Sequence, residues 1–246
     1  MSELWVIVPA YQEERRITGT LEALAAQRDR EFTLLVADNG STDGTVDAVR
    51  AFAARAPFPV EVLVEPEKGV GSAVDTAFRH AIARGAGLLA RTDADCLPEP
   101  GWTAAARSAL RGGGGLVCGR VTARRDEHGP AGRAVFLVLV ALGAFFGRIR
   151  PAHRLRHGYL TPYRMHAGNN MAITAELYQA VGGMPRRPSP TDRLFVNLVR
   201  RHTTAIVHRR DMVVQNSTRR IRAYGVVGTA RWYLDRGSGS RAADVR

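Results

Sequence analysis

Short apolar runs alternate with amphipathic segments along the first 95 residues of the chain. The runs are rich in branched side chains and predict strands at 4–8, 32–37, 60–64 and 87–90. The segments between them place apolar residues at helical spacing and predict helices at 13–27, 45–55 and 71–84. Strands that alternate with helices are typical of an α/β fold, in which helices cover both faces of a mostly parallel sheet.

This alternation fades after Pro98. The remaining patterns predict a strand at 116–123, an apolar helix at 134–147, an Arg- and His-rich loop at 148–167, a short helix at 174–183, a helix at 191–201, a strand pair near 204–215 and a basic amphipathic helix at 219–236. The last ten residues, 237–246, are predicted to form a flexible tail.

Polar and glycine residues gather directly after the four N-terminal strands. The strings are "PAYQEE" at 9–14, "DNGSTDGT" at 38–45, "EPEKGVG" at 65–71 and "RTDADC" at 91–96. Ligands of open α/β sheets bind at the carboxyl ends of the strands. We therefore expect the four loops to converge on one crevice.

Two carboxylates in the fourth loop, Asp93 and Asp95, are separated by a single alanine. They can share a hard divalent cation such as Mg²⁺ or Mn²⁺, which prefers oxygen ligands and keeps positions open for substrate phosphates. Asp95 could instead cap a short helix without any metal. The position of the pair after an apolar strand and opposite three polar loops favours the metal site.

The second and third loops offer groups suited to a nucleotide. Asp38 ends a strand and could accept hydrogen bonds from a base or ribose, although this string also suits a solvated turn. Gly69 and Gly71 permit the close backbone approach that phosphate-handling loops need. Lys68, within the third string, is the only lysine of the chain, and no GxxxxGK[ST] motif is present.

Five motifs in order carry a family resemblance: "IVPAYQEE", "DNGSTDGT", "EKGVGSAVDTAF", "TDADCLPEPGW" and "AGNNMAITAELYQAVGGMP". Across residues 4–200 the chain resembles the inverting family 2 glycosyltransferases. The resemblance implies a GT-A fold, with a Rossmann-like mostly parallel sheet and a C-terminal acceptor-binding portion. Residues 1–98 would then bind the nucleotide-sugar donor, and residues 99–236 would form the acceptor-binding and catalytic half of the same domain.

The resemblance also implies roles for individual residues. The nucleotide would be bound by Pro9, Tyr11, Glu13, Asp38, Lys68, Gly69 and Asp93, the metal by Asp95, and the sugar and acceptor by His166, Gly168, Asn169 and Asn170. The catalytic base would be Asp192, preceded by Thr191 where the family usually has glutamate. In "QNSTRR", Arg219 and Arg220 would clamp the diphosphate, because guanidinium forks match phosphate oxygens; an ordinary basic start of a helix is the alternative.

The net charge of +12 is unevenly placed. Residues 1–145 carry 16 basic and 18 acidic side chains, whereas residues 146–246 carry 19 and 5. Such asymmetry indicates an anionic partner, which could be a phosphate, a nucleic acid or a membrane surface. We expect no specific binding of nucleic acid.

The uncharged run 134–147 is 14 residues long, whereas spanning a bilayer takes about 20. Three interpretations of 134–166 remain open at this point: a peripheral contact with a membrane, arginines placed over a phosphorylated or lipid-diphosphate acceptor, or a core helix followed by a solvated lid. Cys96 and Cys118 form no metal-binding or disulfide pattern, and no secretory signal precedes the first strand. We expect a cytoplasmic protein, and its association with a membrane stays open.

The predicted activity follows from the resemblance. A sugar would pass from a nucleotide-diphosphate sugar to an acceptor hydroxyl by metal-assisted single displacement with inversion. A sugar nucleotidyltransferase is an alternative, but it would usually carry a glycine-rich phosphate loop near the first strand, where the chain has "VIVPAYQEE". A catalytically inactive nucleotide-binding relative is a further alternative.

Overall fold

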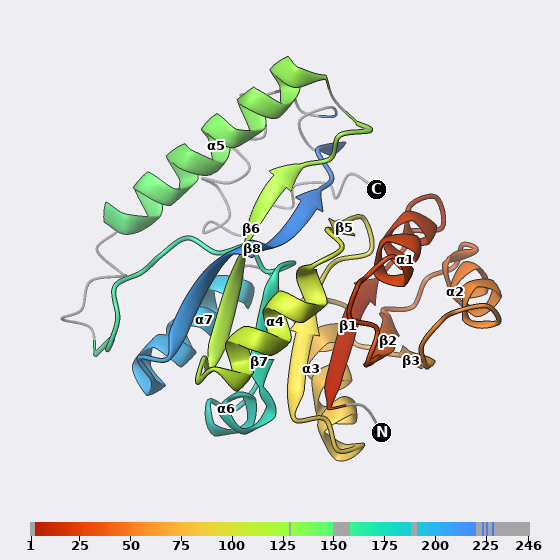
Figure 1. Ribbon diagram of the computed structural model, residues 1–246, viewed down its shortest axis with the longest axis horizontal. Coiled ribbons are helices and arrows are strands. Elements are labelled where there is room, and N and C mark those ends of the chain that lie inside the picture. Colours follow the sequence, from red (N-terminus) through yellow and green to blue (C-terminus); the bar gives the residue numbers. More distant parts are fainter. Residues whose placement is uncertain are drawn as a thin grey trace.

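The computed structural model describes residues 3–127, 129–149, 158–187 and 191–219, together with Ala223, Gly225 and Gly228 (Figure 1). Its strands form one sheet in the order β3-β2-β1-β4-β7-β6-β8-β5. Their bounds are β1 Leu4–Ala10, β2 Phe32–Asp38, β3 Val60–Val64, β4 Leu88–Arg91, β5 Leu97–Pro98, β6 Leu116–Ala123, β7 Met171–Thr174 and β8 Ile206–Asn216. Four of the seven strand pairings are parallel, so the predicted mostly parallel sheet is confirmed.

Helices cover both faces of this sheet. They are α1 Ile17–Ala25, α2 Thr45–Ala53, α3 Val70–Ala83, α4 Trp102–Arg111, α5 Pro130–Ile149, α6 Ala175–Ala180 and α7 Thr191–His202. One hydrophobic core joins α1, α2 and α4 to the sheet, and a second core on the opposite face joins α3, α6 and α7. β1 and β2 are buried along their whole length because both their faces are covered.

The register of the parallel strands brings their carboxyl ends together. Ala10 pairs with Asp38, and Asp38 pairs with Val64. Hydrogen bonds then join the loops that follow, as between Gln12 Nε2 and Thr42 Oγ1 at 2.8 Å. The expected convergence of the polar loops at one edge is confirmed for the first three strands, and the fourth joins through side chains described below.

The C-terminal half departs from the sequence prediction in three places. Neither α4 nor β7 was predicted, and β7 runs antiparallel to both β4 and β6. The predicted strand pair near 204–215 is wrong, because this segment is the single strand β8. Its register against β6 shifts between Gly119 and Arg120, so residues 210–212 lie in a bulge.

α5 overturns the interpretation of 134–147 as a core helix. The helix lies against β6 at one end of the sheet (Figure 1), and none of its described side chains is buried. No helix within the described ranges has the combination of length and apolar character needed to cross a bilayer. Several predictions fall outside the described residues: the diphosphate role of Arg220, most of the loop 148–157, most of the helix 219–236, and the tail 237–246.

Candidate active site

Asn39 joins the second and third polar loops. Its Nδ2 donates to the carbonyls of Glu65 and Glu67, both at 2.8 Å, and its Oδ1 accepts from the amide of Gly69 at 2.7 Å. Gly69 has a φ of 137°, which side chains rarely adopt, so glycine is needed at this turn into α3. Asn39 therefore fixes the shape of the predicted nucleotide edge, a role that the sequence analysis did not assign.

Lys68 lies over the aromatic ring of Tyr11 at the same edge of the sheet. The Lys68 ammonium lies 4.0 Å from the centre of the Tyr11 ring and donates to the carbonyls of Asn39 and Gly40 at 2.7 and 3.1 Å. A cation over an aromatic face is attracted by the ring. These contacts hold the cation of the third loop over the first and second loops.

The two remaining residues of this edge are more enclosed than expected. Asp38 is buried, and its carboxylate accepts from the amides of Gly40 and Ser41 at 3.0–3.3 Å. Pro9 is buried inside β1, where it pairs with Ala37. Asp38 therefore shapes the turn after β2 as well as ending the strand, whereas Pro9 belongs to the sheet itself.

Arg91, at the end of β4, joins the acidic loop to α7. Its guanidinium donates to Asp93 Oδ1 at 3.0 Å through Nε and to Asp192 Oδ1 at 2.7 Å through Nη1. Arg91 is 2% exposed, whereas the side chains of Asp93 and Asp192 are each about a third exposed. One buried cation thus positions two carboxylates that stand 99 residues apart in the sequence.

The electrostatics of this group favour the ion pairs. Burial by itself lowers the pKa of Arg91, but the carboxylates of Asp192 and Asp93 outweigh it and raise that pKa. Burial raises the pKa of Asp93, with Asp95 and Asp192 adding to the rise and Arg91 opposing it. Arg91 therefore stays charged and limits the repulsion among the acids.

Gly168 lies directly against the carboxylate of Asp192. A Cβ built at Gly168 would stand 1.9 Å from Asp192 Oδ2, well inside contact distance. Thr191, beside it, is buried, and a Cβ at Gly71 would lie 2.8 Å from its methyl group. The loop 166–170 and the start of α7 are therefore matched in shape around Asp192.

We expect Gly168→Ala to displace the Asp192 carboxylate from Arg91. The free energy of unfolding should fall by about 1–3 kcal/mol, the usual cost of overpacking, and turnover should fall while donor binding is kept. Thermal melts and steady-state kinetics measure the two effects. Gly101→Ala is the matched control, because a Cβ at Gly101 meets nothing within 4 Å; equal behaviour of the two variants would contradict the prediction.

Arg219 makes a second bridge between acids. Its Nη1 lies 2.7 Å from Glu13 Oε1, and its Nη2 lies 3.3 Å from Asp95 Oδ2. Glu127 holds the preceding segment in place by accepting from the amide of Thr218 at 2.6 Å and the hydroxyl of Ser217 at 2.9 Å. The first loop, the acidic loop and the segment after β8 therefore meet at Arg219.

Glu13 and Asp95 supply hard oxygen atoms around this point. Glu13 Oε2 is buried and has no hydrogen-bond partner among the residues that the structure describes, with Arg16 Nη1 at 3.7 Å. Burial raises the pKa of Glu13, Arg219 opposes this rise and Asp95 adds to it. Within the part of the chain that the structure describes, no cluster of three or more His, Cys, Asp or Glu side chains has metal-site geometry.

This donor set fits a cation that is shared with a substrate. Mg²⁺ and similar ions are commonly held by one or two carboxylates, with the remaining ligands coming from phosphates and water. Asp95 is the carboxylate placed for this, since its Oδ2 faces Arg219 and its Oδ1 lies 3.3 Å from the Cys96 thiol. Burial raises the pKa of Cys96 well above its ordinary value, so the thiol stays protonated and is no anionic ligand.

The residues predicted to bind sugar and acceptor separate into two groups. Asn169 lies at the acidic loop, with Nδ2 3.1 Å from Cys96 Sγ and a buried Oδ1 that has no hydrogen-bond partner in the described structure. Asn170 is fully buried and bonds to Trp102 Nε1 and to the carbonyls of Arg120 and Met212. Asn170 therefore connects α4, β6 and β8, and we leave it out of the substrate site.

His166 lies near Asp192. Its ring packs edge-on against Tyr163, with the centroids 5.7 Å apart, and burial lowers its pKa despite the opposing charge of Asp192. The imidazole is therefore neutral at neutral pH and can offer a hydrogen bond without a charge.

Comparisons with known proteins show the family and the fold of the chain. Residues 5–178 match the pattern of the family described as glycosyl transferase family 2. Glycosyltransferase AglE of Haloferax volcanii is 35% identical over 130 residues, which are 51% of this chain and 41% of AglE. The chain spans less than half the length of the curated relatives that it matches.

Solved structures of glycosyltransferases share the fold. The crystal structure of residues 1–349 of S. aureus TarS aligns with a TM-score of 0.66 at 18% identity, over 99% of this chain and 67% of that chain. The mannosyltransferase PcManGT from Pyrobaculum calidifontis, in complex with GDP-Man and Mn²⁺, aligns with a TM-score of 0.64 at 25% identity, over 95% of this chain and 64% of that chain. The fold is GT-A, and the chain belongs to glycosyl transferase family 2.

Proposed function

We propose that this glycosyltransferase moves a sugar from a nucleotide-diphosphate sugar to an acceptor hydroxyl, with inversion at the anomeric carbon. The observation that carries the proposal is the pair of arginine bridges at the sheet edge. Arg91 places Asp192 beside Asp93, and Arg219 places Asp95 beside Glu13. A carboxylate suited to a catalytic base and another suited to a cation thus lie next to the loops that would bind the nucleotide.

The donor would lie along the carboxyl edge of β1, β2 and β4. Tyr11 presents an aromatic ring that a base can stack on, backed by Lys68 at 4.0 Å. Asp38, Gly69 and Asp93 complete the edge toward the ribose and phosphates. PcManGT, with GDP-Man bound, supports a donor of this chemical class.

A divalent cation, Mg²⁺ or Mn²⁺, belongs to the proposed site and would be held by Asp95. When bound, it would neutralise the charge that develops on the departing nucleoside diphosphate. Arg219 already contacts Asp95 and can turn its guanidinium fork toward a diphosphate that occupies the same space. The ion pair with Glu13 would keep Arg219 at this edge while the diphosphate binds and leaves.

Asp192 would take the proton from the acceptor hydroxyl. Its side chain is 31% exposed, so an acceptor can reach it, and its Oδ1 is held by Arg91. The Gly168 backbone lies against the carboxylate, and His166 beside it is placed to orient the acceptor. The attack on the anomeric carbon forms the new bond as the bond to the diphosphate breaks on the opposite side, which inverts the configuration.

We expect Asp95→Ala to weaken metal-dependent binding of a nucleoside diphosphate. Loss of an outer-shell partner alone costs about 10–100-fold in metal affinity, so the direct ligand should cost at least about tenfold. Isothermal titration with and without Mn²⁺ measures the change. Asp47→Asn is the control, because Asp47 is 82% exposed and pairs with Arg50 on α2; equal Mn²⁺ dependence in Asp95→Ala and the native protein would contradict the assignment.

The reaction is tested by incubating the purified chain with nucleotide sugars and Mn²⁺ and measuring release of nucleoside diphosphate. The proposal predicts release for one donor class, either by transfer or by slow hydrolysis. Binding of a donor without any release in a single-turnover experiment would identify the chain as a nucleotide-binding relative without catalysis. Release of inorganic diphosphate from a sugar phosphate and a nucleoside triphosphate would instead identify a nucleotidyltransferase.

We infer a cytoplasmic location from the two thiols. Cys96 and Cys118 are both buried and unpaired in a disulfide. Burial raises the pKa of Cys118 to about 12, which makes it a poor partner for oxidation. A reducing compartment suits both residues.

A further inference from the structure

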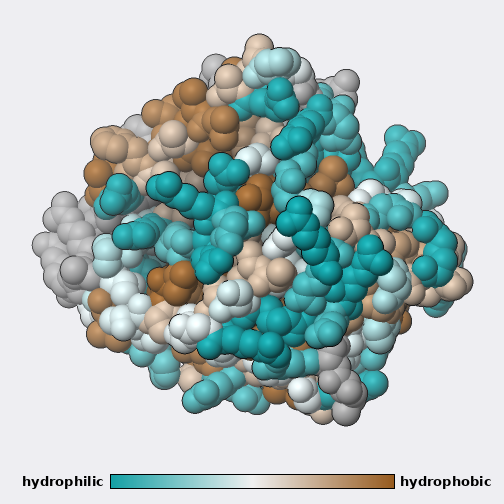
Figure 2. Space-filling view, in the orientation of Figure 1, coloured by the Kyte–Doolittle hydropathy of each residue, from teal (hydrophilic) through white to brown (hydrophobic). Residues whose placement is uncertain are grey.

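Two features of the chain outside the proposed active site lie side by side. One is the outer face of α5, and the other is a cavity of about 990 Å³ below that helix. Figure 2 shows hydrophobic side chains gathered over α5, with hydrophilic ones directly beside them. Leu137 lies on the side of α5 between the two features, because it is half exposed and lines the cavity.

The outer face of α5 carries a continuous apolar stripe. Val138, Leu142, Phe145 and Ile149 recur at intervals of four, three and four residues, which is the spacing of one helical face. These four side chains are between 48% and 59% exposed. Single exposed apolar residues are ordinary, but a stripe of four along one helix indicates a partner surface.

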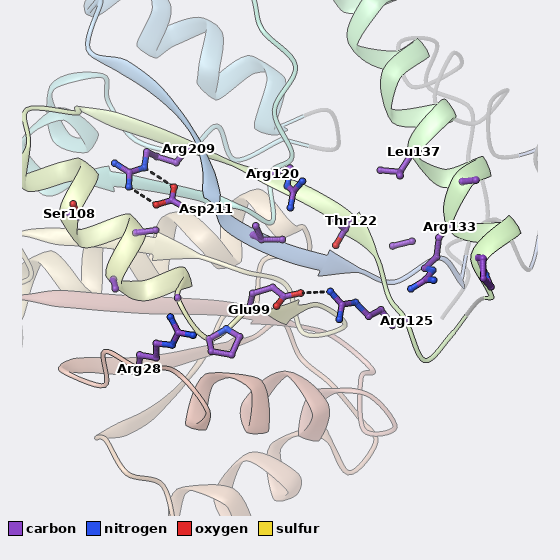
Figure 3. Close-up of a pocket in the computed structure, with 18 residues that line it drawn as sticks. Arg28, Glu99, Ser108, Arg120, Thr122, Arg125, Arg133, Leu137, Arg209 and Asp211 are labelled. Carbon is purple, nitrogen blue, oxygen red and sulfur yellow. Dashed lines mark hydrogen bonds and ion pairs between the residues drawn. The ribbon is translucent and has the colours of Figure 1, made fainter.

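The cavity below α5 is lined by arginines from five separate segments. They are Arg28 after α1, Arg120 on β6, Arg125 after β6, Arg133 on α5 and Arg209 on β8. Arg133 and Leu137 project from α5 toward the strand that carries Arg120 and Thr122 (Figure 3). The floor is apolar, with Ala105 and Val213 among its residues.

The positive charge of this cavity is not balanced by its own acids. Arg125 lies 3.6 Å from Glu99, and Arg209 bonds to Asp211 at 2.8 Å. Arg28, Arg120 and Arg133 have no ion-pair partner among the residues that the structure describes. Three guanidinium groups without an acidic partner line this one cavity and favour the binding of an anion. The geometry of a guanidinium group suits two phosphate oxygens.

We propose that α5 and this cavity together dock the chain on a membrane surface rich in anionic phospholipid. The apolar stripe would enter the boundary between headgroups and acyl chains, as interfacial helices do, and the arginines would bind lipid phosphate groups. A soluble phosphate would explain the arginines without the stripe, and a nucleic acid would gain nothing from the stripe. The proposal is independent of the donor and of the reaction at the acidic loop.

The test is co-sedimentation of the full chain with vesicles. One set contains equal parts of phosphatidylcholine and phosphatidylglycerol, and the other contains phosphatidylcholine alone. We expect binding to the anionic vesicles at least about tenfold stronger than to the neutral ones, since each arginine near an anionic surface contributes about fivefold. Equal binding to both sets, or binding to neither, overturns the proposal.

Matched variants separate the two features. Arg120→Gln with Arg133→Gln should lower the affinity for anionic vesicles by about 30-fold, and Val138→Ser with Leu142→Ser by at least about tenfold. All four side chains are on the surface or line the cavity, so melting temperatures should stay unchanged. The control is Arg50→Gln with Arg55→Gln, which removes the same charge from α2 and the turn after it, where both arginines are paired.

Other occupants give distinct results. If sedimentation shows a dimer that Val138→Ser with Leu142→Ser dissolves, and vesicles do not bind, the stripe is a contact between copies and the proposal fails. If inorganic phosphate binds the chain and Arg120→Gln with Arg133→Gln abolishes that binding without vesicle recruitment in the native chain, the cavity serves a soluble anion and the proposal also fails. Vesicle binding equal in the control and cavity variants is a third contradicting outcome.

Discussion

Asp192→Asn should lower turnover by about 10²–10⁴-fold, the usual contribution of a general base, while binding of the donor stays unchanged. Asparagine keeps the shape of the side chain, and its carbonyl oxygen can still accept from Arg91 Nη1, which now lies at 2.7 Å. It cannot take up the proton of the acceptor hydroxyl. The loss should therefore appear in kcat, with the affinity for the nucleotide sugar preserved.

Release of nucleoside diphosphate and isothermal titration of the donor measure these two quantities. Asp47→Asn is the matched control, because Asp47 occupies the first turn of α2 as Asp192 occupies the first turn of α7. Both substitutions remove the same favourable charge from a helix N-terminus. Turnover in Asp192→Asn equal to that of Asp47→Asn would remove Asp192 from the role of base.

Arg91→Gln should destabilise the fold and also lower turnover. Removing one partner of a buried ion pair typically costs about 3–5 kcal/mol, because the remaining charge is left without compensation. The loss of unfolding free energy in Arg91→Gln should lie near the lower end of this range. The carboxylates of Asp93 and Asp192 are each about a third exposed and keep contact with solvent. Turnover should fall because Asp192 loses the group that holds it.

The destabilisation should depend on pH in a defined direction. Burial already raises the pKa of Asp93, and loss of Arg91 would raise it further. The loss of stability in Arg91→Gln should be greatest above the pKa of Asp93, where the carboxylates are charged. It should shrink as the pH falls through that pKa and the carboxylates become neutral. Denaturant unfolding at a series of pH values measures this. A deficit that grows as the pH falls would contradict the ion-pair explanation.

Two further variants distinguish positioning from stability. Arg91→Lys keeps the charge but lacks the fork that reaches two carboxylates, so it should restore part of the stability and less of the turnover. Arg107→Gln removes a largely buried arginine of α4 that pairs with Asp29 at 2.7 Å and donates to the carbonyl of Glu31. It should lower stability while leaving turnover of the folded protein unchanged.

The N-terminal half could be predicted closely from the sequence. The strands β1, β2 and β4 read as continuous apolar runs because helices cover both of their faces, and their polar ends lead into the site. α1 begins at Ile17 instead of residue 13, and residues 13–16 form a turn in which the amides of Arg16 and Ile17 both donate to the Glu13 carbonyl at 2.9 Å. The Glu13 amide itself bonds to Thr45 Oγ1 at 2.9 Å, a tertiary contact that a local pattern does not carry.

The C-terminal half was less predictable for identifiable reasons. α4 is rich in alanine and has only two large apolar residues, Trp102 and Leu110, although both are buried. β7 has only four residues, and they follow a turn within the "GNNMA" string. In α5 a run of apolar residues suggested a core helix, yet a run of this kind does not distinguish a core face from an exposed stripe.

The candidate site shows the same limit. The sequence indicated the acidic residues of the loops, and the structure places Asp93 and Asp192 at one guanidinium. Arg91 was not assigned a role because its importance depends on Asp192, which is distant in the sequence. A charged residue directly after the buried run "GLLA" is the signal that could have identified it, since a buried charge needs partners. The division of the chain into halves at residue 98 stays a prediction.

The most direct measurement is a crystal structure of the chain grown with a nucleoside diphosphate and Mn²⁺. We predict a metal ion on Asp95 that also contacts the diphosphate, with the Arg219 guanidinium turned toward the phosphate oxygens and Arg91 still joining Asp93 to Asp192. A nucleotide bound elsewhere, with Arg219 still paired to Asp95 and no metal beside it, would contradict the proposed donor site.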